Sequence, residues 1–516
     1  MKQQIKEEKE EIKELNQTVT ENKTKFLSKK QNIFVISLIF LAFFILLSIY
    51  WVYKNTGNVT LEQLIFHLKV PIKGTNVGMV WDYIIWTFPR VLLIVIACSI
   101  MVYIYEKKSK SEVPKKQKIL YFLAKIILAL SIIIVLCVMN VFGFAKNQIM
   151  ASELIEKEYV DPSTANIIFP KEKQNLIYIY LESMENTFSS KENGGMYVEN
   201  RIPELTEIAK NNINFSNTDK IGGALDLKGT QWTIAAMVSQ TSGIPLKITI
   251  GDNDYGNHAT FLPGAYSLGE VLEKNGYKNY LLLGSESEFG GRKSYFESHG
   301  NYNIWDYVSA IEEKRMTEDE KVWWGYSDGD LFKYAKEQLI KISQKEEPFN
   351  YTLLTVDTHF TDGYVCETCN TEHFNDQYSN VIRCSSQKVS EFINWIKEQP
   401  FYKNTTIIIS GDHLTMQAST EEEADKNNYR ERTVYNAIIN SKAKAVTTTN
   451  RKFFTIDMYP TTLAALGATI EGNRLGLGTN LFSNEQTLAE KYGVEYAREE
   501  LEKKSIFYNK KLIYND

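Results

Sequence analysis

The distribution of apolar residues divides the chain into two different parts. Three long apolar stretches lie near the amino terminus, at residues 33–53, 81–105 and 119–144. Each is long enough to cross the hydrocarbon core of a bilayer as a helix, and the first contains no charged residue. We therefore expect a membrane domain of three transmembrane helices over residues 33–145, after a polar tail over residues 1–32.

From residue 167 onward, short apolar runs rich in β-branched residues alternate with amphipathic segments. The runs predict strands at Asn175–Glu182, Asn279–Gly284, Phe349–Asp357 and Thr405–Ser410. Helices are predicted near Pro203–Asn211, after Thr230, near Gln387–Glu398 and at Asp457–Gly467. This alternation is typical of a doubly wound α/β domain. We expect that domain to span residues 167–516 and a polar, helical connector to span residues 146–166.

The lysines indicate which side of the membrane each part occupies. Lys23, Lys25, Lys29 and Lys30 stand shortly before the first apolar stretch, and six more lysines lie in the loop 106–118 between the second and third. The positive-inside rule places both segments in the cytoplasm, so the domain after the third helix is expected outside the cell membrane. The segment 54–79 is then external too and is a candidate amphipathic helix in the membrane interface. The net charge of -5 gives no indication of nucleic-acid binding.

All four predicted strands end in polar residues or are closely followed by them. These are Glu182, Glu286, Asp357 with His359, and Asp412 with His413. Ligands of open α/β sheets bind at the carboxyl ends of the strands, so we expect these residues to share one site. Glu182, Asp412 and His413 supply the oxygen and nitrogen ligands that divalent cations use.

Thr230 is a candidate nucleophile. It follows a glycine turn at Gly229 and precedes a segment that predicts a helix, which places its hydroxyl at a helix amino terminus. A bound cation helps a threonine hydroxyl lose its proton, whereas the structural alternative is a helix N-cap. Trp232 either packs over a bound substrate or belongs to the core.

Several motifs together carry a family resemblance. They are YLES around Glu182, the Gly-Thr pair at 229–230 followed by WTIAAMVSQTSGIPL, EFGGRKSYFESHG around Arg292, TVDTHFTDGY around His359, SGDH at 410–413, and DMYPTTLAALG. In this order they resemble the lipoteichoic acid synthase and phosphoglycerol transferase branch of the alkaline phosphatase superfamily. The resemblance implies a sulfatase-like domain, and the motifs around Arg292 and His359 are closer to the transferases that decorate glycans.

The resemblance also implies roles for single residues. Glu182, Thr230, Asp412 and His413 are expected to bind one divalent cation, usually manganese in this branch, although the ligand types also suit magnesium or zinc. Thr230 is implied as the nucleophile. Arg292 and His359 are implied to hold the phosphoglycerol group, and His359 also to transfer a proton. Glu286 is expected either to contact glycerol hydroxyls or to neutralise Arg292.

Two features depart from the polymerases of this branch. Leu283 stands where they carry a substrate-contacting histidine, and they have five membrane spans where this sequence predicts three. Because of the first departure, the family's contacts to glycerol are not carried over to Leu283. Because of the second, the way in which the polymerases' membrane region handles lipid is not carried over to this chain.

The expected function is therefore transfer of glycerol phosphate from phosphatidylglycerol, a membrane lipid, to an extracytoplasmic glycan or cell-envelope polymer. Phosphoethanolamine transfer is an alternative with the same nucleophile and fold. A sulfatase or phosphodiesterase is another, although no C/S-x-P-x-R motif of sulfatases surrounds Thr230. A non-catalytic scaffold is the alternative of a different class, and it would need neither metal ligands nor a nucleophile.

Three cysteines cluster late in the chain, at Cys366, Cys369 and Cys384. Disulfides persist outside the cytoplasm, so we expect one bridge, between Cys369 and Cys384, with one thiol left over. A zinc site is the alternative, but no histidine at zinc-finger spacing accompanies these cysteines.

Overall fold

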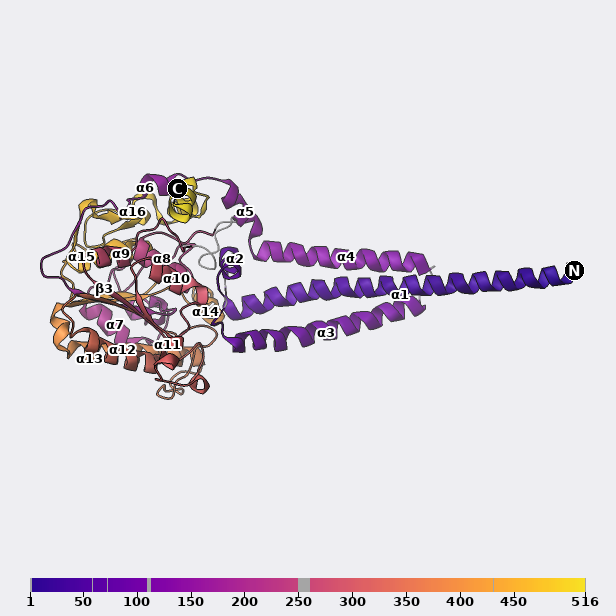
Figure 1. Cartoon of the computed structure of the whole chain (residues 1–516), viewed down its shortest axis with the longest axis horizontal. Coiled ribbons are helices and arrows are strands. Elements are labelled where there is room, and N and C mark those ends of the chain that lie inside the picture. The colour runs from indigo at the N-terminus through magenta and orange to yellow at the C-terminus, as the bar shows by residue number, and fades with distance from the viewer. Residues whose placement is uncertain are drawn as a thin grey trace. The chain divides into compact units, whose positions relative to one another are not determined.

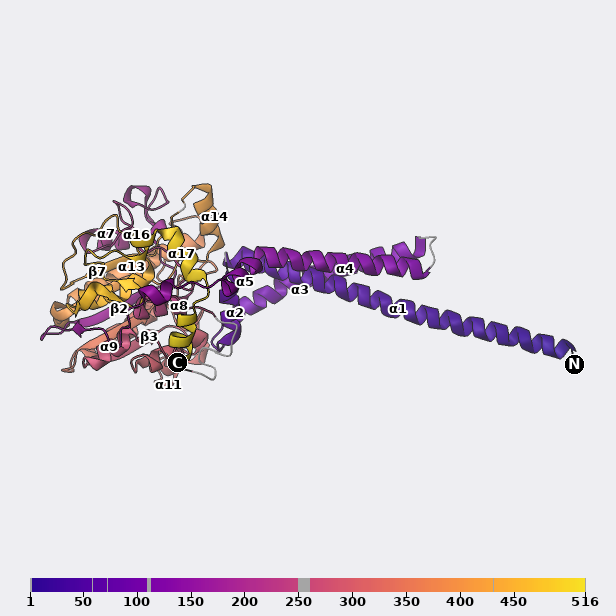
Figure 2. The same cartoon turned by 90° about the horizontal axis from the view of Figure 1, so that it is seen from above.

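The computed structural model describes residues 2–57, 59–71, 73–108, 113–248, 260–429 and 431–515 (Figures 1 and 2). The chain forms two compact units. The first contains Met1–Lys54 and Val77–Phe142, and the second contains Asn55–Asn76 and Gly143–Asp516. The segment between the first two apolar stretches therefore belongs to the second unit, whereas the sequence analysis assigned it to the membrane domain.

The first unit consists of long helices. They are α1 (Lys2–Thr56), α3 (Val77–Lys108) and α4 (Val113–Val138). Within them, residues 30–56, 77–105 and 118–138 are long and apolar enough to cross a membrane, which agrees with the three predicted stretches. The third helix ends earlier than expected, because Asn140 has a left-handed φ of 48° and separates α4 from α5 (Val141–Ile149).

A six-stranded sheet organises the second unit. Its strands are β2 (Asn175–Leu181), β3 (Lys278–Leu283), β4 (Asn303–Trp305), β5 (Phe349–Leu354), β6 (Thr405–Gly411) and β7 (Asn436–Ile439). The order is β4-β3-β5-β2-β6-β7, and all neighbours are parallel except β6 and β7. Every residue of β2, β5 and β6 is buried, which explains why these strands read as continuous apolar runs. The predicted α/β fold is confirmed.

Helices cover both faces of this sheet (Figure 1). Successive strand residues point to opposite faces, so Tyr178 and Tyr180 belong to one core and Ile177 and Ile179 to the other. One face packs against α8 (Thr233–Ser242), α9 (Leu268–Lys274) and α15 (Met458–Ala465). The other packs against α7 (Pro203–Asn211), α11 (Tyr307–Glu312), α12 (Asp328–Ile342) and α13 (Gln377–Lys397).

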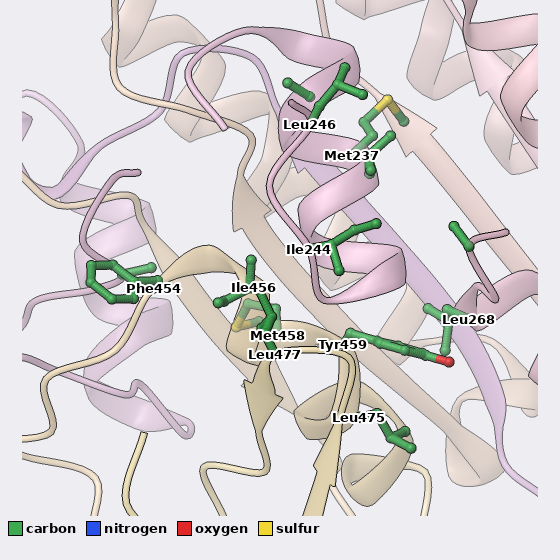
Figure 3. Close-up of a cluster of buried hydrophobic side chains, with 14 of the residues drawn as sticks. Met237, Ile244, Leu246, Leu268, Phe454, Ile456, Met458, Tyr459, Leu475 and Leu477 are labelled. Atoms are coloured by element: carbon green, nitrogen blue, oxygen red, sulfur yellow. The ribbon is translucent and has the colours of Figure 1, made fainter. Parts of the chain in front are cut away.

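The core beside α8 joins segments that lie far apart in the sequence. Figure 3 shows Met237 on α8 and, just after this helix, Ile244, which lies near Ile456, Met458 and Tyr459. All five side chains are buried. This packing holds α8 against the later part of the chain, and the loop that carries Thr230 ends where α8 begins.

The remaining elements are short. The helices are α6 (Leu154–Glu158), α10 (Arg292–Ser298), α14 (Ala418–Lys426), α16 (Leu488–Tyr492) and α17 (Val494–Glu502), with a π-helical turn at Tyr508–Tyr514. Two ribbons pair β1 (Ile167–Ile168) with β8 (Thr469–Ile470) and β9 (Arg474–Leu475) with β10 (Gly478–Thr479). The connector 146–166 is helical only at its start and in α6.

Two predicted helices need correction in their bounds. α13 begins at Gln377, well before the expected Gln387, because the Asp376 side chain caps it by accepting a hydrogen bond from the Ser379 N–H. The late helix is confirmed but ends at Ala465, and Gly467 follows with a positive φ of 91°.

The segment between the first two apolar stretches forms α2 (Leu61–Lys69), a short helix capped by Thr60, whose hydroxyl accepts from the Gln63 N–H at 3.2 Å. The amphipathic helix expected here is therefore present. Phe66 of α2 and Val70, which caps the carboxyl end of the helix, are buried in the core of the second unit, so protein covers that face.

Candidate active site

The site forms where β2 and β6 end side by side. Leu181 pairs with Gly411 in the parallel ladder, so the next residues, Glu182 and Asp412, emerge from the same edge of the sheet. His413 Nε2 lies 3.6 Å from Glu182 Oε1 and 3.3 Å from Asp412 Oδ2. Ligand atoms of all three residues lie within 4.8 Å of one another, and all three side chains are buried. The structure therefore brings together the three strand-end residues that the sequence predicts as metal ligands.

The hydrogen bonds of His413 and Asp412 leave one possible ligand atom on each side chain available to a cation. His413 Nδ1 bonds the Leu414 carbonyl oxygen at 2.8 Å, and because a carbonyl only accepts, Nδ1 carries the proton and Nε2 a lone pair. Asp412 Oδ1 accepts from the N–H groups of Ser183 and His413, each at 2.7 Å. Asp412 Oδ2 is buried and has no hydrogen-bond partner among the described residues. These donor atoms fit a divalent cation.

The electrostatics of this cluster follow from burying several titratable groups together. Burial and the charge of Glu182 raise the pKa of Asp412. Burial opposes ionisation of Glu182 too, but the imidazoles of His359 and His413 outweigh that effect and lower its pKa. Burial likewise opposes protonation of His413, but the two carboxylates raise its pKa. A bound cation would favour the ionised carboxylates and offset the burial of negative charge.

Thr230 lies in the loop that leads to α8. Gly229 adopts a φ of 81°, and a Cβ there would lie 2.6 Å from the Leu246 carbonyl oxygen. Thr230 is buried, and its hydroxyl donates to the Leu227 carbonyl oxygen at 2.9 Å. The N-cap of α8 is Trp232, so Thr230 precedes the helix and does not cap it. Thr233, the first residue of α8, donates to Glu182 Oε2 at 3.3 Å, which places the amino end of α8 and the loop before it beside the candidate metal ligands.

Arg292 is held by backbone carbonyl groups. Its Nε donates to the Phe289 carbonyl oxygen at 3.0 Å and its Nη2 to that of Glu286 at 2.7 Å. Nη1 has no hydrogen-bond partner in the part of the chain that the structure describes. Burial lowers the pKa of Arg292 to about 10, so the guanidinium remains charged at neutral pH. A fixed cation with an open N–H pair is suited to a phosphodiester oxygen.

Glu286 does not pair its side chain with Arg292. Its nearest cationic partner is Lys321 at 3.8 Å, and its Oε2 is buried without a hydrogen bond to any described residue. The structure therefore does not support the expected role in which Glu286 neutralises Arg292.

His359 and Asp357 follow the same strand but face different partners. His359 Nδ1 donates to the Phe360 carbonyl oxygen at 2.6 Å, which leaves a lone pair on Nε2. Burial lowers the pKa of His359, although Glu182 opposes this shift. Asp357 instead binds Lys388 Nζ at 3.1 Å and accepts from the Asp328 N–H at 3.1 Å. Asp357 therefore anchors its loop, and the expectation that it shares the site is wrong.

Aromatic side chains line the site, and the sequence analysis singled out only one of them. Trp232 is buried, with its ring 5.4 Å from Phe66. Trp324 lies 4.7 Å from His359 and 5.2 Å from Phe289, measured between ring centroids. The indole N–H groups of both tryptophans are buried without a partner among the described residues. The adjacent pair Trp323–Trp324 was the one sequence signal for Trp324.

The fold and this cluster agree with a known family. Its model, described as sulfatase, matches residues 174–468, more than half of the chain. This chain belongs to the sulfatase family. The matched range contains Glu182, Thr230, Arg292, His359 and the Asp412–His413 pair.

Two curated relatives share the name phosphoglycerol transferase I. Phosphoglycerol transferase I of Salmonella choleraesuis is 32% identical over 328 residues, which are 62% of this chain and 40% of the relative. The protein of the same name from Citrobacter koseri is 31% identical over 340 residues, 64% of this chain and 41% of the relative. The alignment thus spans less than half the length of these relatives.

Solved structures show more distant likeness. A protein of the alkaline phosphatase superfamily from Vibrio parahaemolyticus is 18% identical, with a TM-score of 0.49 over 66% of this chain and 79% of that one. A lipoteichoic acid synthase from Listeria monocytogenes is 16% identical, with a TM-score of 0.49 over 64% of this chain and 82% of that one.

Proposed function

We propose that this protein is a membrane-anchored, metal-dependent phosphoglycerol transferase. It takes glycerol phosphate from phosphatidylglycerol, holds it on Thr230, and passes it to an extracytoplasmic glycan or cell-envelope polymer. The observation that carries the proposal is the buried cluster of Glu182, Asp412 and His413, whose Asp412 Oδ2 and His413 Nε2 are open, beside the loop of Thr230. The likeness to phosphoglycerol transferase I supports the choice of head group.

One divalent cation would be held by Glu182, Thr230, Asp412 and His413. We propose manganese, and the same ligand types accept magnesium or zinc. When bound, the cation would lower the pKa of the Thr230 hydroxyl and neutralise charge on the phosphoryl oxygens.

Arg292 and Thr230 act on the donor in the first step. The open Nη1 of Arg292 binds a phosphodiester oxygen and orients the phosphorus. Thr230 enters as the alkoxide, its proton having gone to solvent, and its oxygen forms a bond to phosphorus while the bond from phosphorus to the diacylglycerol oxygen breaks. Protonated His359 gives the proton at Nε2 to the departing diacylglycerol.

The second step returns these residues to their starting states. Neutral His359 takes the proton of the acceptor hydroxyl, whose oxygen attacks phosphorus and releases the Thr230 alkoxide. The His359 tautomer suits this role, because Nδ1–H is held by the Phe360 carbonyl and Nε2 stays available for the proton.

The proposed arrangement places the catalytic domain, residues 167–516, outside the cell membrane and the membrane domain, residues 33–145, within it. The donor lipid then resides in the same membrane as the enzyme. The ten lysines that flank the predicted cytoplasmic ends support this orientation.

Mass spectrometry of the Thr230 peptide tests the proposal. Full-length protein is reconstituted in vesicles that contain labelled phosphatidylglycerol and phosphatidylethanolamine, without acceptor. A glycerophosphoryl adduct on Thr230, absent from Thr230→Ala, is the expected result. A phosphoethanolamine adduct would establish the alternative donor, and unmodified Thr230 despite head-group release would exclude the covalent intermediate.

A further inference from the structure

The segment between the first two apolar stretches is packed against the loops that surround the active site. Gln63 of α2 donates to the sulfur of Met416 at 3.4 Å. After α2, Lys73 pairs with Glu288 at 3.1 Å. A Cβ at Gly74 would lie 2.8 Å from the Cβ of Glu286, so the backbone at Gly74 lies against this glutamate, whose Oε2 has no hydrogen-bond partner among the described residues.

Two side chains of α2, Phe66 and His67, pack against aromatic residues of the candidate active site. Phe66 is fully buried against Trp232, two residues after Thr230. The His67 ring stacks on Phe289, with 6.0 Å between centroids and 24° between planes. Phe289 also lies 5.6 Å from the guanidinium carbon of Arg292. His67 is therefore one ring away from the residue proposed to bind the phosphodiester.

Both ring nitrogens of His67 are available for hydrogen bonds to a ligand. Neither ring nitrogen has a hydrogen-bond partner among the described residues, and the side chain is only partly exposed. Burial and the nearby His359 lower the pKa of His67 to about 4, so the ring is neutral under ordinary conditions. A neutral imidazole offers one N–H donor and one nitrogen acceptor, which matches a hydroxyl group better than it matches an anion.

We propose that His67 is a substrate-contacting residue, which hydrogen-bonds a hydroxyl of the donor's glycerol head group. The inference rests on the proposed function. The phosphate already has Arg292 and the candidate cation site, whereas the hydroxyls need neutral or acceptor partners. Glu286 Oε2, buried without a partner among the described residues, lies under the same segment at Gly74. His67 lies outside the range 174–468 that the family model matches.

The test compares two soluble chromogenic phosphodiesters with the full-length protein in detergent. One is p-nitrophenyl phosphoglycerol, and the other is methyl p-nitrophenyl phosphate, which has no hydroxyl on the alkyl side. His67→Phe keeps a ring to stack on Phe289 but removes both hydrogen-bonding nitrogens. We expect it to raise the ratio of the two KM values, glycerol ester over methyl ester, by about tenfold, the size of one lost hydrogen bond.

Two further variants make the result specific. His67→Asn keeps a donor and an acceptor and should restore part of the discrimination. Leu68→Ala removes a side chain that is 79% exposed on the same helix and should leave the KM ratio unchanged. An unchanged ratio in His67→Phe, or equal losses with both esters, would overturn the inference.

Failure of the proposed function gives a different result. If the wild type cleaves the soluble esters but never transfers a head group from phosphatidylglycerol, the proposed transferase reaction is wrong. The KM ratio would still report whether His67 recognises glycerol hydroxyls.

Discussion

The backbone N–H of Ser183 donates a hydrogen bond to Asp412 Oδ1 at 2.7 Å and so joins the ends of β2 and β6. The His413 N–H uses the same oxygen. Because both N–H groups converge on Oδ1, the other carboxylate oxygen stays open beside His413 Nε2. The parallel pairing of two strands therefore builds the candidate metal site.

Removing a ligand should remove the metal. Glu182→Ala and His413→Ala are each expected to weaken cation binding by more than about 100-fold, since loss of a supporting contact alone costs 10–100-fold. Metal content of the purified protein, measured by mass spectrometry, checks this. His373→Ala is the matched control, because His373 pairs with Glu199 on the surface. Equal metal content in all four proteins would show that these are not the ligands.

Thr230→Ala should separate activity from stability. The hydroxyl exchanges hydrogen bonds only with Leu227 among the described residues, so its loss should cost about 1 kcal/mol of unfolding free energy. Turnover of phosphatidylglycerol should disappear, because the covalent step has no nucleophile. Thr230→Ser keeps the hydroxyl and should retain activity. Near wild-type transfer by Thr230→Ala would instead favour direct attack by the acceptor.

The catalytic domain should be accessible from outside the cell. Protease added to intact spheroplasts is expected to remove the domain that follows about residue 151, because the lysines at residues 23–30 and 107–118 mark the cytoplasmic side. Immunoblotting against the carboxyl terminus measures the loss. Complete protection in spheroplasts, with cleavage after lysis, would reverse the orientation.

One disulfide should be found by peptide mapping. Cys369 and Cys384 are bonded in the structure, with 5.4 Å between their Cα atoms, and Cys366 is a buried free thiol. The bridge closes a loop with a sequence separation of 15, worth about 3 kcal/mol of unfolding free energy in the chain-entropy model. Cys384→Ser should lose that stability, and Cys366→Ser should lose less. Three free thiols in the oxidised, purified protein would exclude the bridge.

Lys247 should make the unfolding free energy rise with pH in the alkaline range. Burial lowers its pKa from 10.5 to about 8, where its ammonium group donates to the carbonyl oxygens of Leu501 and Lys503. Between these pH values the unfolded chain binds more protons than the folded one, so the unfolding free energy rises with pH, by at most about 3 kcal/mol.

Denaturant titrations at several pH values check this slope. Lys247→Met has no titrating group at this position, so its unfolding free energy should rise less steeply between pH 8 and 9.5 than that of wild type. Parallel curves for the two proteins would show that Lys247 does not titrate in this range.

The sequence by itself determined the sheet and the main site residues. A strand buried on both faces of a parallel sheet must be apolar throughout, so β2, β5 and β6 are visible as uninterrupted runs, and the polar residues after them mark one edge. Glu182, Asp412 and His413 were found in this way. The membrane helices could also be predicted from the sequence, since length and hydropathy alone define them.

Only the tertiary structure decided which residues complete the site. Asp357 and His359 both follow β5, yet Lys388, a partly buried lysine on α13, pairs with the Asp357 carboxylate and takes it away from the site. The sequence gives α2 an amphipathic pattern, but it does not say whether lipid or protein covers the apolar face. That choice depends on Trp232 and Phe289, which lie more than 160 positions further along the chain and meet Phe66 and His67 only after folding. Local patterns record which side chains must be buried, and the fold alone selects their partners.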